Sequence, residues 1–386
     1  MSFSIGLCIS PTSDNQVRMI RGALGYINEH PDLRVYKEGA MPYLPWERAR
    51  NWKGDGIIAT TEDKSRQEQL IRLKQPAVSV TGHLDPHDDL PTVLSDNHAI
   101  GKLAAEHLVE QGLHQFAYVG HEDWYTDRVR MEGFKETIER AGYTCQLIDV
   151  RLKRKHGRHA SDVFEVNLSP LSKEIRRLET PVGVGVAHDE FAHDVIATCK
   201  ALNKHVPYDI SVVGVNNHRL ICETTDPPIS SIRQRAERIG YEAAALMHRL
   251  LKGDSPPTKP ILLPPGNLVL RRSSDYLAID DRMIRQAIQE IRRYCGSPIT
   301  AEDIADKLLV SRRTLDKRFV AAVGHPSAEE IRLSRIRLAK QLLSDTELQI
   351  VAIGFRCGYE STSGFIRAFR EATEQTPRSF RLQASG

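Results

Sequence analysis

Polar and aromatic side chains recur directly after short apolar segments in the first 270 residues. They are Asp14 after "SFSIGLCIS", Asp96 after "PTVLS", Trp124 and Arg130 after "FAYVG", Asp189 after "VGVGVA", and Asn216 after "ISVVGV". Carboxylates, amides and a guanidinium supply paired hydrogen-bond donors and acceptors, and an indole supplies an apolar face. This combination suits an uncharged, polyhydroxylated ligand such as a sugar. The alternative for each Asp or Asn is helix capping, which is frequent where a helix follows a strand.

A second group of reactive side chains is the basic stretch "SRRTLDKRF" at residues 311–319. Leu315 and Phe319 lie four residues apart on one helical face, and Arg and Lys side chains occupy the rest. Such a face can contact a polyanion, but the commoner alternative is a solvated surface helix. The neighbouring sequence has to decide between the two interpretations.

The elements that must position the first group alternate between strand and helix patterns. Strands are predicted at 54–60, 76–82, 116–120, 182–187 and 210–215, and helices at 15–29, 98–112, about 127–141 and 190–203. This alternation predicts doubly wound parallel sheets, in which ligands bind beyond the carboxyl ends of the strands. The sequence has no P-loop, no GxGxxG at the start of a helix and no GxSxG elbow. We therefore expect a binding domain rather than an enzyme.

Three segments carry a family resemblance. They are "SDNHAIGKLAAEHLVEQGLHQFAYVG" (95–120), "ISVVGVNN" (210–217) and "ISSIRQRAERIGYEAAALMHRLL" (229–251). They resemble the ligand-binding core of the lactose-repressor family, which is built like the periplasmic sugar-binding proteins. The resemblance covers roughly residues 3–273. It implies one lobe from about 1–112 plus 234–258 and another from about 113–231 plus 260–273.

The same resemblance implies a sugar-contacting arginine three residues before a Gly-aromatic pair, which in "RMEGF" is Arg130. Two positions depart from the family pattern. His188-Asp189 stands where the family has Asn-Asp, and Asn216 stands where it has Asp. These departures leave the identity of the sugar open. Members of this family carry a DNA-binding helix-turn-helix before the core, whereas this core begins at residue 3, so we expect any DNA-binding part to lie elsewhere.

After the Pro-rich stretch at 253–267 the pattern becomes wholly helical, and we expect a domain boundary near Tyr276, between 1–275 and 276–386. Thr300 and Asp303 form a predicted capping box, and a helix-turn-helix follows at about 300–322. A second copy at about 349–373 repeats its apolar positions at offsets of 49 and 50 residues. A linker helix is predicted at 328–344. The repeat favours a functional basic face over a merely solvated one.

The C-terminal arrangement resembles the arabinose-regulator family of transcription activators, through "RIRLAKQLL" (335–343) and "TPRSFR" (376–381). The resemblance implies two helix-turn-helix units that read successive major grooves of double-stranded DNA with repeated half-sites. The expected DNA contacts are Ser311, Arg312, Arg313, Thr314, Lys317, Arg335, Ser361, Thr362, Ser363 and Arg367. Arg312 and Arg313 suit bidentate contacts to guanine, whereas Lys317, Arg335 and Arg367 suit phosphates or internal ion pairs. We expect the first unit to discriminate more between bases, because it is the more basic.

Composition agrees with this interpretation. The 386 residues suffice for two or three domains, and the net charge of +3 arises mainly after residue 277. There is no apolar run of membrane-spanning length and no secretory signal pattern. Six scattered cysteines without zinc-ligand spacing predict reduced thiols in a cytoplasmic protein. The sequence predicts neither a metal nor a cofactor.

A sugar-binding core followed by an arabinose-regulator module is similar in order to the family of bacterial xylose operon activators, as are "NWKGDGIIA" and "LRRSSDY". The resemblance implies a homodimeric, sugar-responsive activator of a xylose or related pentose operon, which contacts RNA polymerase. Two alternatives stay open. One is a repressor released by its ligand, and the other is the same architecture responding to another sugar or sugar derivative.

Overall fold

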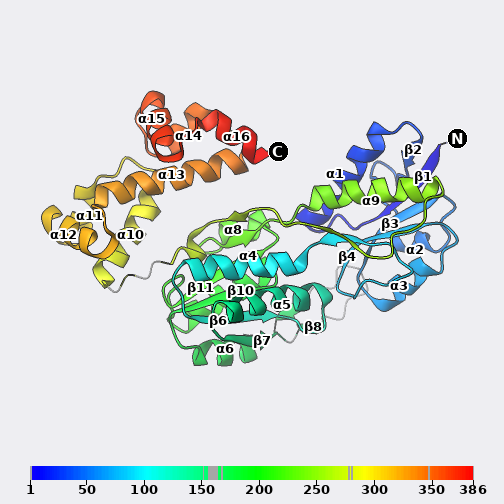
Figure 1. The fold of residues 1–386 in the computed structure, drawn as a ribbon, viewed down its shortest axis with the longest axis horizontal. Helices are drawn as coiled ribbons and strands as arrows, with labels where there is room; N and C mark the ends of the chain where they lie inside the picture. The colour runs from blue at the N-terminus through cyan, green and yellow to red at the C-terminus, as the bar shows by residue number, and fades with distance from the viewer. Residues whose placement is uncertain are drawn as a thin grey trace. The chain divides into compact units, whose positions relative to one another are not determined.

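The computed structural model describes residues 2–150, 152–154, 164–166, 168–276, 279, 281–346 and 348–385. The chain divides into two compact units, Met1–Tyr276 and Leu277–Gly386. The first combines sheets with helices and the second is built from helices, as Figure 1 shows. This confirms the predicted fold class, an α/β core followed by an all-α domain with two helix-turn-helix units.

The first unit has two lobes, and the first lobe is centred on a parallel sheet of order β2-β1-β3-β4. These strands are β1 (Phe3–Cys8), β2 (Leu33–Val35), β3 (Gly56–Thr61) and β4 (Ala77–Gly82). Two further strands, β5 (Val93–Ser95) and β13 (Ile261–Leu263), pair in parallel beside it. The helices of this lobe are α1 (Asp14–Glu29), α2 (Trp46–Ala49), α3 (Lys64–Ile71) and α9 (Ala236–Leu251).

The second lobe contains a six-stranded sheet of order β14-β12-β11-β10-β6-β7, parallel except for β14. Its strands are β6 (Gln115–Gly120), β7 (Cys145–Asp149), β10 (Val182–Val186), β11 (Ile210–Val215), β12 (Ser230–Ile232) and β14 (Leu268–Val269). A separate pair is β8 (Leu152–Arg154) with β9 (Phe164–Val166). The helices are α4 (Asn97–Glu110), α5 (Tyr125–Arg140), α6 (Leu168–Arg177), α7 (Asp189–Ala201), α8 (Arg219–Thr224) and the short η1 (Arg272–Ser274).

The chain crosses between the lobes at different points from those expected. Helix α4 was expected within the first lobe, but Ile100, Ala104 and Leu108 belong to the hydrophobic core of the second. Conversely, β13 was expected in the second lobe, yet it pairs with β5. An amphipathic pattern shows that a face is buried but not which sheet covers it. The boundaries at 112 and 260 were therefore wrong.

Close glycine contacts bring one pair of helices together in each lobe. A Cβ atom on Gly101 of α4 would lie 1.8 Å from the carbonyl oxygen of Arg130 in α5, and one on Gly133 would lie 2.1 Å from that of His98. In the first lobe, Gly22 of α1 meets the backbone of α9 in the same way. Figure 1 shows α4 beside α5 and α1 beside α9. Only glycine permits these crossings, and the first of them sets the position of Arg130.

The second unit begins with α10 (Arg282–Tyr294) and ends with α16 (Pro377–Ser385). Between them lie α11 (Ala301–Lys307), α12 (Arg312–Val323), α13 (Ser327–Asp345), α14 (Ile350–Arg356) and α15 (Thr362–Thr373). The predicted Thr300–Asp303 capping box is confirmed. Each helix pair has its own core, one around Leu315 and Phe319 and the other around Phe365 and Phe369. Over the described residues, no helix is long and apolar enough to cross a membrane.

Candidate functional site

Four side chains meet at the carboxyl ends of β6, β10 and β11. Arg130 donates from Nη1 to the carbonyl oxygen of Ala187 at 2.6 Å and lies 3.5 Å from Nδ1 of His188. The side-chain amide of Asn216 lies 3.4 Å from the same ring nitrogen. The Trp124 ring stands edge-on to the His188 ring, with 6.1 Å between centroids. Three of the six predicted effector contacts, Trp124, Arg130 and Asn216, are therefore brought together.

A buried carboxylate supports this cluster from below. Oδ1 of Asp127 lies 2.7 Å from Nε2 of His188, and Oδ2 accepts from the backbone N–H of His121. Burial by itself raises the pKa of Asp127, but the contact with His188 and the charge of Arg130 bring it below its ordinary value. Burial also lowers the pKa of the Arg130 guanidinium. Opposite charges are thus compensated within a nearly dry site.

The cluster is connected to two of the three segments that cross between the lobes, the one before α4 and the one before α9. Nε of Arg130 donates to Oδ1 of Asn97 at 2.9 Å. The Gln234 side chain donates to Oδ1 of Asn216 at 2.5 Å and accepts from Ser95 Oγ at 2.9 Å. A change in the cluster can therefore be transmitted to the crossing segments through hydrogen bonds. Sequence analysis did not predict the roles of Asn97, Asp127, His188 and Gln234, although His188 was visible as a departure from the family pattern.

The loop after β4 contacts the start of α5 across the two lobes. The His83 ring stacks on the Trp124 ring with centroids 3.9 Å apart, and the backbone N–H of Tyr125 donates to the His83 carbonyl at 2.8 Å. Arg128 forms an ion pair with Asp85 at 2.5 Å. Burial lowers the pKa of His83 to about 4, so this ring is neutral at pH 7. The lobes therefore meet through aromatic, backbone and charged contacts at one side of the cleft.

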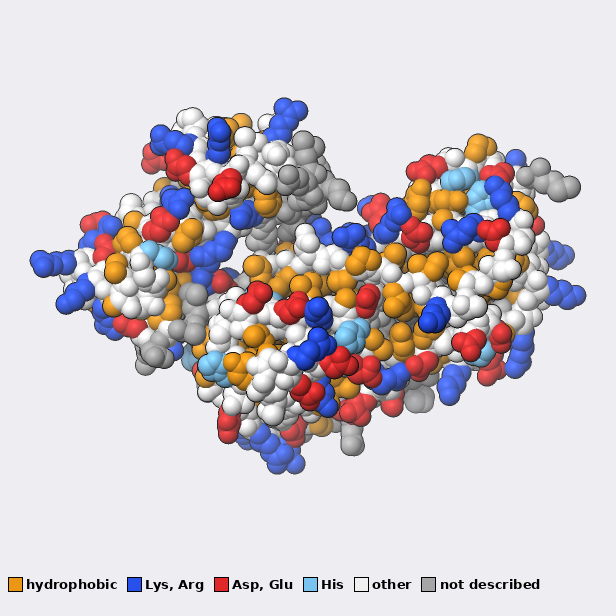
Figure 2. Space-filling view, in the orientation of Figure 1, with side chains coloured by type: hydrophobic (Ala, Val, Ile, Leu, Met, Phe, Trp, Pro, Cys, Tyr) orange, Lys and Arg blue, Asp and Glu red, His pale blue; other side chains and the backbone are white. Residues whose placement is uncertain are grey.

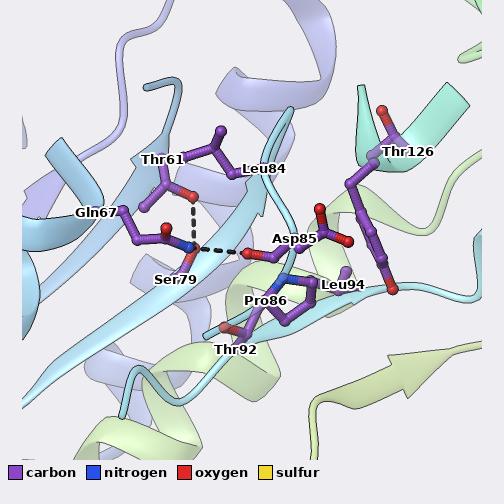
Figure 3. A pocket seen from close by; sticks show the side chains of 10 residues that line it. Thr61, Gln67, Ser79, Leu84, Asp85, Pro86, Thr92, Leu94 and Thr126 are labelled. Carbon is purple, nitrogen blue, oxygen red and sulfur yellow. Dashed lines mark hydrogen bonds between the residues drawn. The ribbon is translucent and has the colours of Figure 1, made fainter. Parts of the chain in front are cut away.

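A pocket rich in hydroxyl groups lies beside this contact (Figure 3). Its lining includes Thr61, Ser79, Thr92, Tyr125 and Thr126, from both lobes. The Thr61 and Ser79 hydroxyls are 3.2 Å apart, and Gln67 donates to the Asp85 carbonyl. Within the described residues, no three His, Cys, Asp or Glu side chains gather in a metal-binding arrangement.

The backbone is unusual where β11 ends. Asn216 and Asn217 have φ angles of 109° and 51°, a region that non-glycine residues seldom adopt. Arg271 donates to Oδ1 of Asn217 at 2.8 Å, which helps to hold this turn. Backbone strain of this kind concentrates at ligand-binding sites, where the surrounding structure maintains it.

The other predicted effector residues have different surroundings. Asp189 is fully buried, and its two oxygens accept from Ser231 Oγ at 2.6 Å and from the His218 backbone N–H at 2.7 Å. Burial raises its pKa to about 6. Asp96 caps α4 by accepting from the Ala99 N–H, as the capping alternative predicts. Asp14 is exposed in the first turn of α1. The contacts of Asp189 favour support of the fold over ligand contact, whereas ligand contact by Asp96 and Asp14 stays a prediction.

In the first helix-turn-helix unit, Ser311 caps α12 by accepting from the Thr314 N–H. Arg313, Thr314 and Lys317 are exposed on the following turns. Arg312 instead forms ion pairs with Glu302 and Asp316. Figure 2 shows Lys and Arg side chains projecting from the region of α12. This helix thus presents a basic surface, although Arg312 is engaged internally.

The second helix-turn-helix unit repeats the arrangement of the first with fewer charged side chains. Ser361 caps α15 by accepting from the Gly364 N–H, and Ser363 and Arg367 are exposed. Thr362 is half-buried at the first helical position. Arg335, predicted to contact DNA, donates to the carbonyls of Ser297 and Ile299, before the first unit. Its guanidinium also lies 5.7 Å from the Tyr359 ring of the second unit. We therefore assign Arg335 to the joint between the units.

Comparisons with known proteins agree with these two parts. A family model described as a periplasmic binding protein-like domain matches residues 105–274, and one described as a helix-turn-helix domain matches residues 304–383. The Xylose operon regulatory protein of Escherichia coli (strain K12) is 30% identical over 344 residues, which are 87% of this chain and 86% of that protein. The protein of the same name from Haemophilus influenzae is 32% identical over 337 residues, 85% of each.

A solved structure of a xylose-binding transcription activator is similar over 99% of this chain and 98% of that chain, with 26% sequence identity and a TM-score of 0.73. The likeness extends over both units, which accounts for the uncommon order of an α/β core followed by helix-turn-helix pairs. The chain therefore belongs to the family of xylose operon regulatory proteins, which are DNA-binding transcription regulators and not enzymes.

Proposed function

We propose that the first unit binds a pentose, with D-xylose as the first candidate, against Trp124, Arg130 and Asn216. The observation that carries this proposal is the convergence of a guanidinium and an amide on one imidazole nitrogen, with an indole ring edge-on to that imidazole. These groups can donate to and accept from adjacent sugar hydroxyls, and the indole borders the point where they meet. The strained turn at Asn216 is a second support.

The sugar acts in this proposal by changing the contacts between the lobes. The residues that face it are bonded to Asn97 and Gln234, which lie at the crossing segments. A ligand that bonds differently to these groups in two lobe arrangements shifts the population between them. The shift then reaches the DNA-binding unit within a homodimer, and the sugar-bound form activates transcription by recruiting RNA polymerase.

For DNA binding we propose that Arg313 reads base edges and that Lys317 and Arg367 contact phosphates. Ser311, Thr314, Ser361, Thr362 and Ser363 surround the N-termini of α12 and α15, where hydroxyls and backbone N–H groups suit phosphate oxygens. The first helix-turn-helix unit carries more cationic side chains at the start of α12 than the second helix-turn-helix unit carries at the start of α15. It is therefore the unit proposed to discriminate more between sequences.

A thermal-shift screen of the purified full chain tests the effector. D-Xylose is compared with L-arabinose, D-ribose, D-glucose and D-xylonate, because a ligand at 100 times its Kd stabilises by about 2.7 kcal/mol. We expect D-xylose to raise the melting temperature, and the Asn216→Ala variant to lose this response. The matched control is Asn203→Ala, outside the cleft after α7. A response to another sugar alone would keep the cleft proposal and change the effector, whereas no response to any would overturn it.

The ligand-released repressor is separated from the activator by DNA binding and transcription measured together. The probe is a duplex selected from a random library by the full chain in the presence of the stabilising sugar, with a second selection in its absence. An activator of the proposed kind binds the duplex more tightly with sugar and raises transcription from a promoter beside it. Loss of binding on addition of sugar would favour the repressor instead.

A further inference from the structure

The first helix-turn-helix unit contains a charged network around Arg312. Nη1 of Arg312 lies 2.7 Å from Oε2 of Glu302 in α11, and Nε lies 2.6 Å from Oδ2 of Asp316 in α12. The Arg312 and Asp316 side chains are 34% and 28% exposed, so the pair is partly shielded from water. Hydrogen bonding to Asp316 raises the pKa of Arg312. Two nitrogens of its guanidinium, Nε and Nη1, therefore already have partners within the protein.

The other oxygen of Asp316 holds the start of the linker helix. Oδ1 accepts from Ser327 twice, from the backbone N–H at 3.0 Å and from Oγ at 2.6 Å. Ser327 is fully buried at the first position of α13, and the preceding Pro326 supplies no side-chain cap. Asp316 thus satisfies a helix N-terminus that its own cap residue leaves open. The network Glu302–Arg312–Asp316–Ser327 ties together α11, α12 and α13.

The second helix-turn-helix unit lacks every member of this network. At the offsets that align the two repeats, Glu302, Arg312, Asp316 and Ser327 correspond to Val351, Thr362, Ile366 and Pro377. Val351 and Ile366 carry no charge, and Pro377 has no backbone N–H to donate. Since the two units are otherwise built alike, the network is a specific addition to the first. It is not a general requirement for folding a helix-turn-helix.

We propose that Arg312 is a positioning residue for DNA recognition and not a base-reading one. Through Asp316 it fixes α12 relative to α13, and this orients the exposed Arg313 and Lys317 on the following positions of the helix. The inference rests on the proposed function, in which the first helix-turn-helix unit reads DNA. It replaces the expectation that Arg312 contacts guanine, because with Nε and Nη1 held by two carboxylates a bidentate contact to guanine requires at least one ion pair to break.

The test uses the full chain and a duplex selected by the wild-type protein from a random library. Asp316→Asn keeps an acceptor for Ser327 but removes the carboxylate from Arg312, and Arg312→Ala removes the other partner. We expect each to weaken binding to the selected duplex by about tenfold, and the double variant to be no weaker than either alone, as coupled residues behave. Binding to an unselected duplex and the slope of affinity against salt stay as in the wild type, because no phosphate contact is lost.

Direct base reading by Arg312 gives the opposite pattern. Asp316→Asn would then release the guanidinium and leave or improve affinity, whereas Arg312→Ala would still lose it; that result would overturn the proposal. Equal losses on selected and unselected duplexes, with a lower melting temperature, would also overturn it, as damage to the fold. Arg332→Ala is the matched control, because it removes an ion pair with Glu329 on α13 outside the network.

Arg313→Ala, combined with Lys317→Ala, tells failure of this inference from failure of the proposed function. If the first helix-turn-helix unit reads DNA, this variant loses affinity for the selected duplex, whatever the role of Arg312. If the double variant retains full affinity for the selected duplex, the first helix-turn-helix unit does not read DNA. The proposal on DNA reading then falls together with the inference on Arg312.

Discussion

Nε2 of His188 lies 2.7 Å from Oδ1 of Asp127, so a residue at the end of β10 is held by a carboxylate in the first turn of α5. The imidazole also faces Arg130 and Asn216 through its other nitrogen. By the sequence resemblance described above, His188 stands where the lactose-repressor family has asparagine, which is a shorter side chain. His188 thus links Asp127 on one side of its ring to Arg130 and Asn216 on the other.

We expect His188→Asn to weaken pentose binding by about tenfold or more, because it removes the imidazole that Arg130 and Asn216 both face, and hydrogen bonds to charged groups contribute about 1.5–3 kcal/mol. Isothermal titration calorimetry with the effector found in the thermal-shift screen measures the change. His193→Asn is the control, because His193 lies in α7, the helix that begins directly after His188, and is bonded to Thr225 away from the cluster. Unchanged affinity in His188→Asn would show that the sugar does not depend on this cluster.

Buried histidines predict a loss of stability at mildly acid pH. Burial lowers the pKa of His107 to about 4, whereas an unfolded histidine titrates near 6.5. The unfolded chain therefore takes up the proton first, and stability is lost as pH falls from about 6.5 towards 4. At pH 5 this amounts to about 2 kcal/mol for His107. Urea unfolding at pH 7.5 and 5.0 measures it.

His107→Gln should reduce that difference by about the same amount, since the variant has no proton to gain at this position. His114→Gln, at an exposed site, is the control and should keep the wild-type difference. An equal pH dependence in all three proteins would mean that the buried imidazole does not govern the transition.

Two glycines in α1 predict opposite effects of the same substitution. A Cβ on Gly22 would lie 1.7 Å from the carbonyl oxygen of Glu237 in α9, whereas one on Gly25 has no atom within 4 Å. Gly22→Ala should force the helices apart and destabilise by about 3 kcal/mol or more, in the range of overpacked cores. Gly25→Ala should stabilise by about 0.5–1 kcal/mol through helix propensity. Denaturant unfolding compares them, and similar values for both would contradict the close crossing.

Local patterns in the sequence predicted the parts of this protein that local forces determine. The strand and helix patterns, the Thr300–Asp303 capping box and the four-residue spacing within Leu315–Phe319 and Phe365–Phe369 all depend on residues close together along the chain. Hydrophobic periodicity and capping chemistry act over that range. Arg130 was singled out by the motif that surrounds it, and it lies beside His188 in the cluster, whereas its contact with a sugar stays a prediction.

Side-chain partners that are distant along the chain were out of reach. Asp189 follows a strand as a ligand-binding residue would, but Ser231, 42 positions later, holds it inside the fold. Arg312 looks like a base reader until Glu302 and Asp316 are seen on either side of it. The prediction that α4 belongs to the first lobe was wrong for the same reason, because tertiary packing determines which sheet buries a helix.

The turn of the first helix-turn-helix gives a last prediction. Leu309 has a φ angle of 57° and is 93% exposed, and its counterpart in the second unit is Gly358 with a φ angle of 73°. A left-handed conformation costs a leucine roughly 1–2 kcal/mol, and its exposed side chain returns little by packing. Leu309→Asn should therefore stabilise by about 0.5–1 kcal/mol, because asparagine adopts this region more readily. Gly358→Ala should do the reverse, since its Cβ would also lie 2.6 Å from the Ser297 carbonyl. Thermal unfolding of the two variants measures both signs, and a destabilised Leu309→Asn would mean that the exposed leucine packs against something in solution.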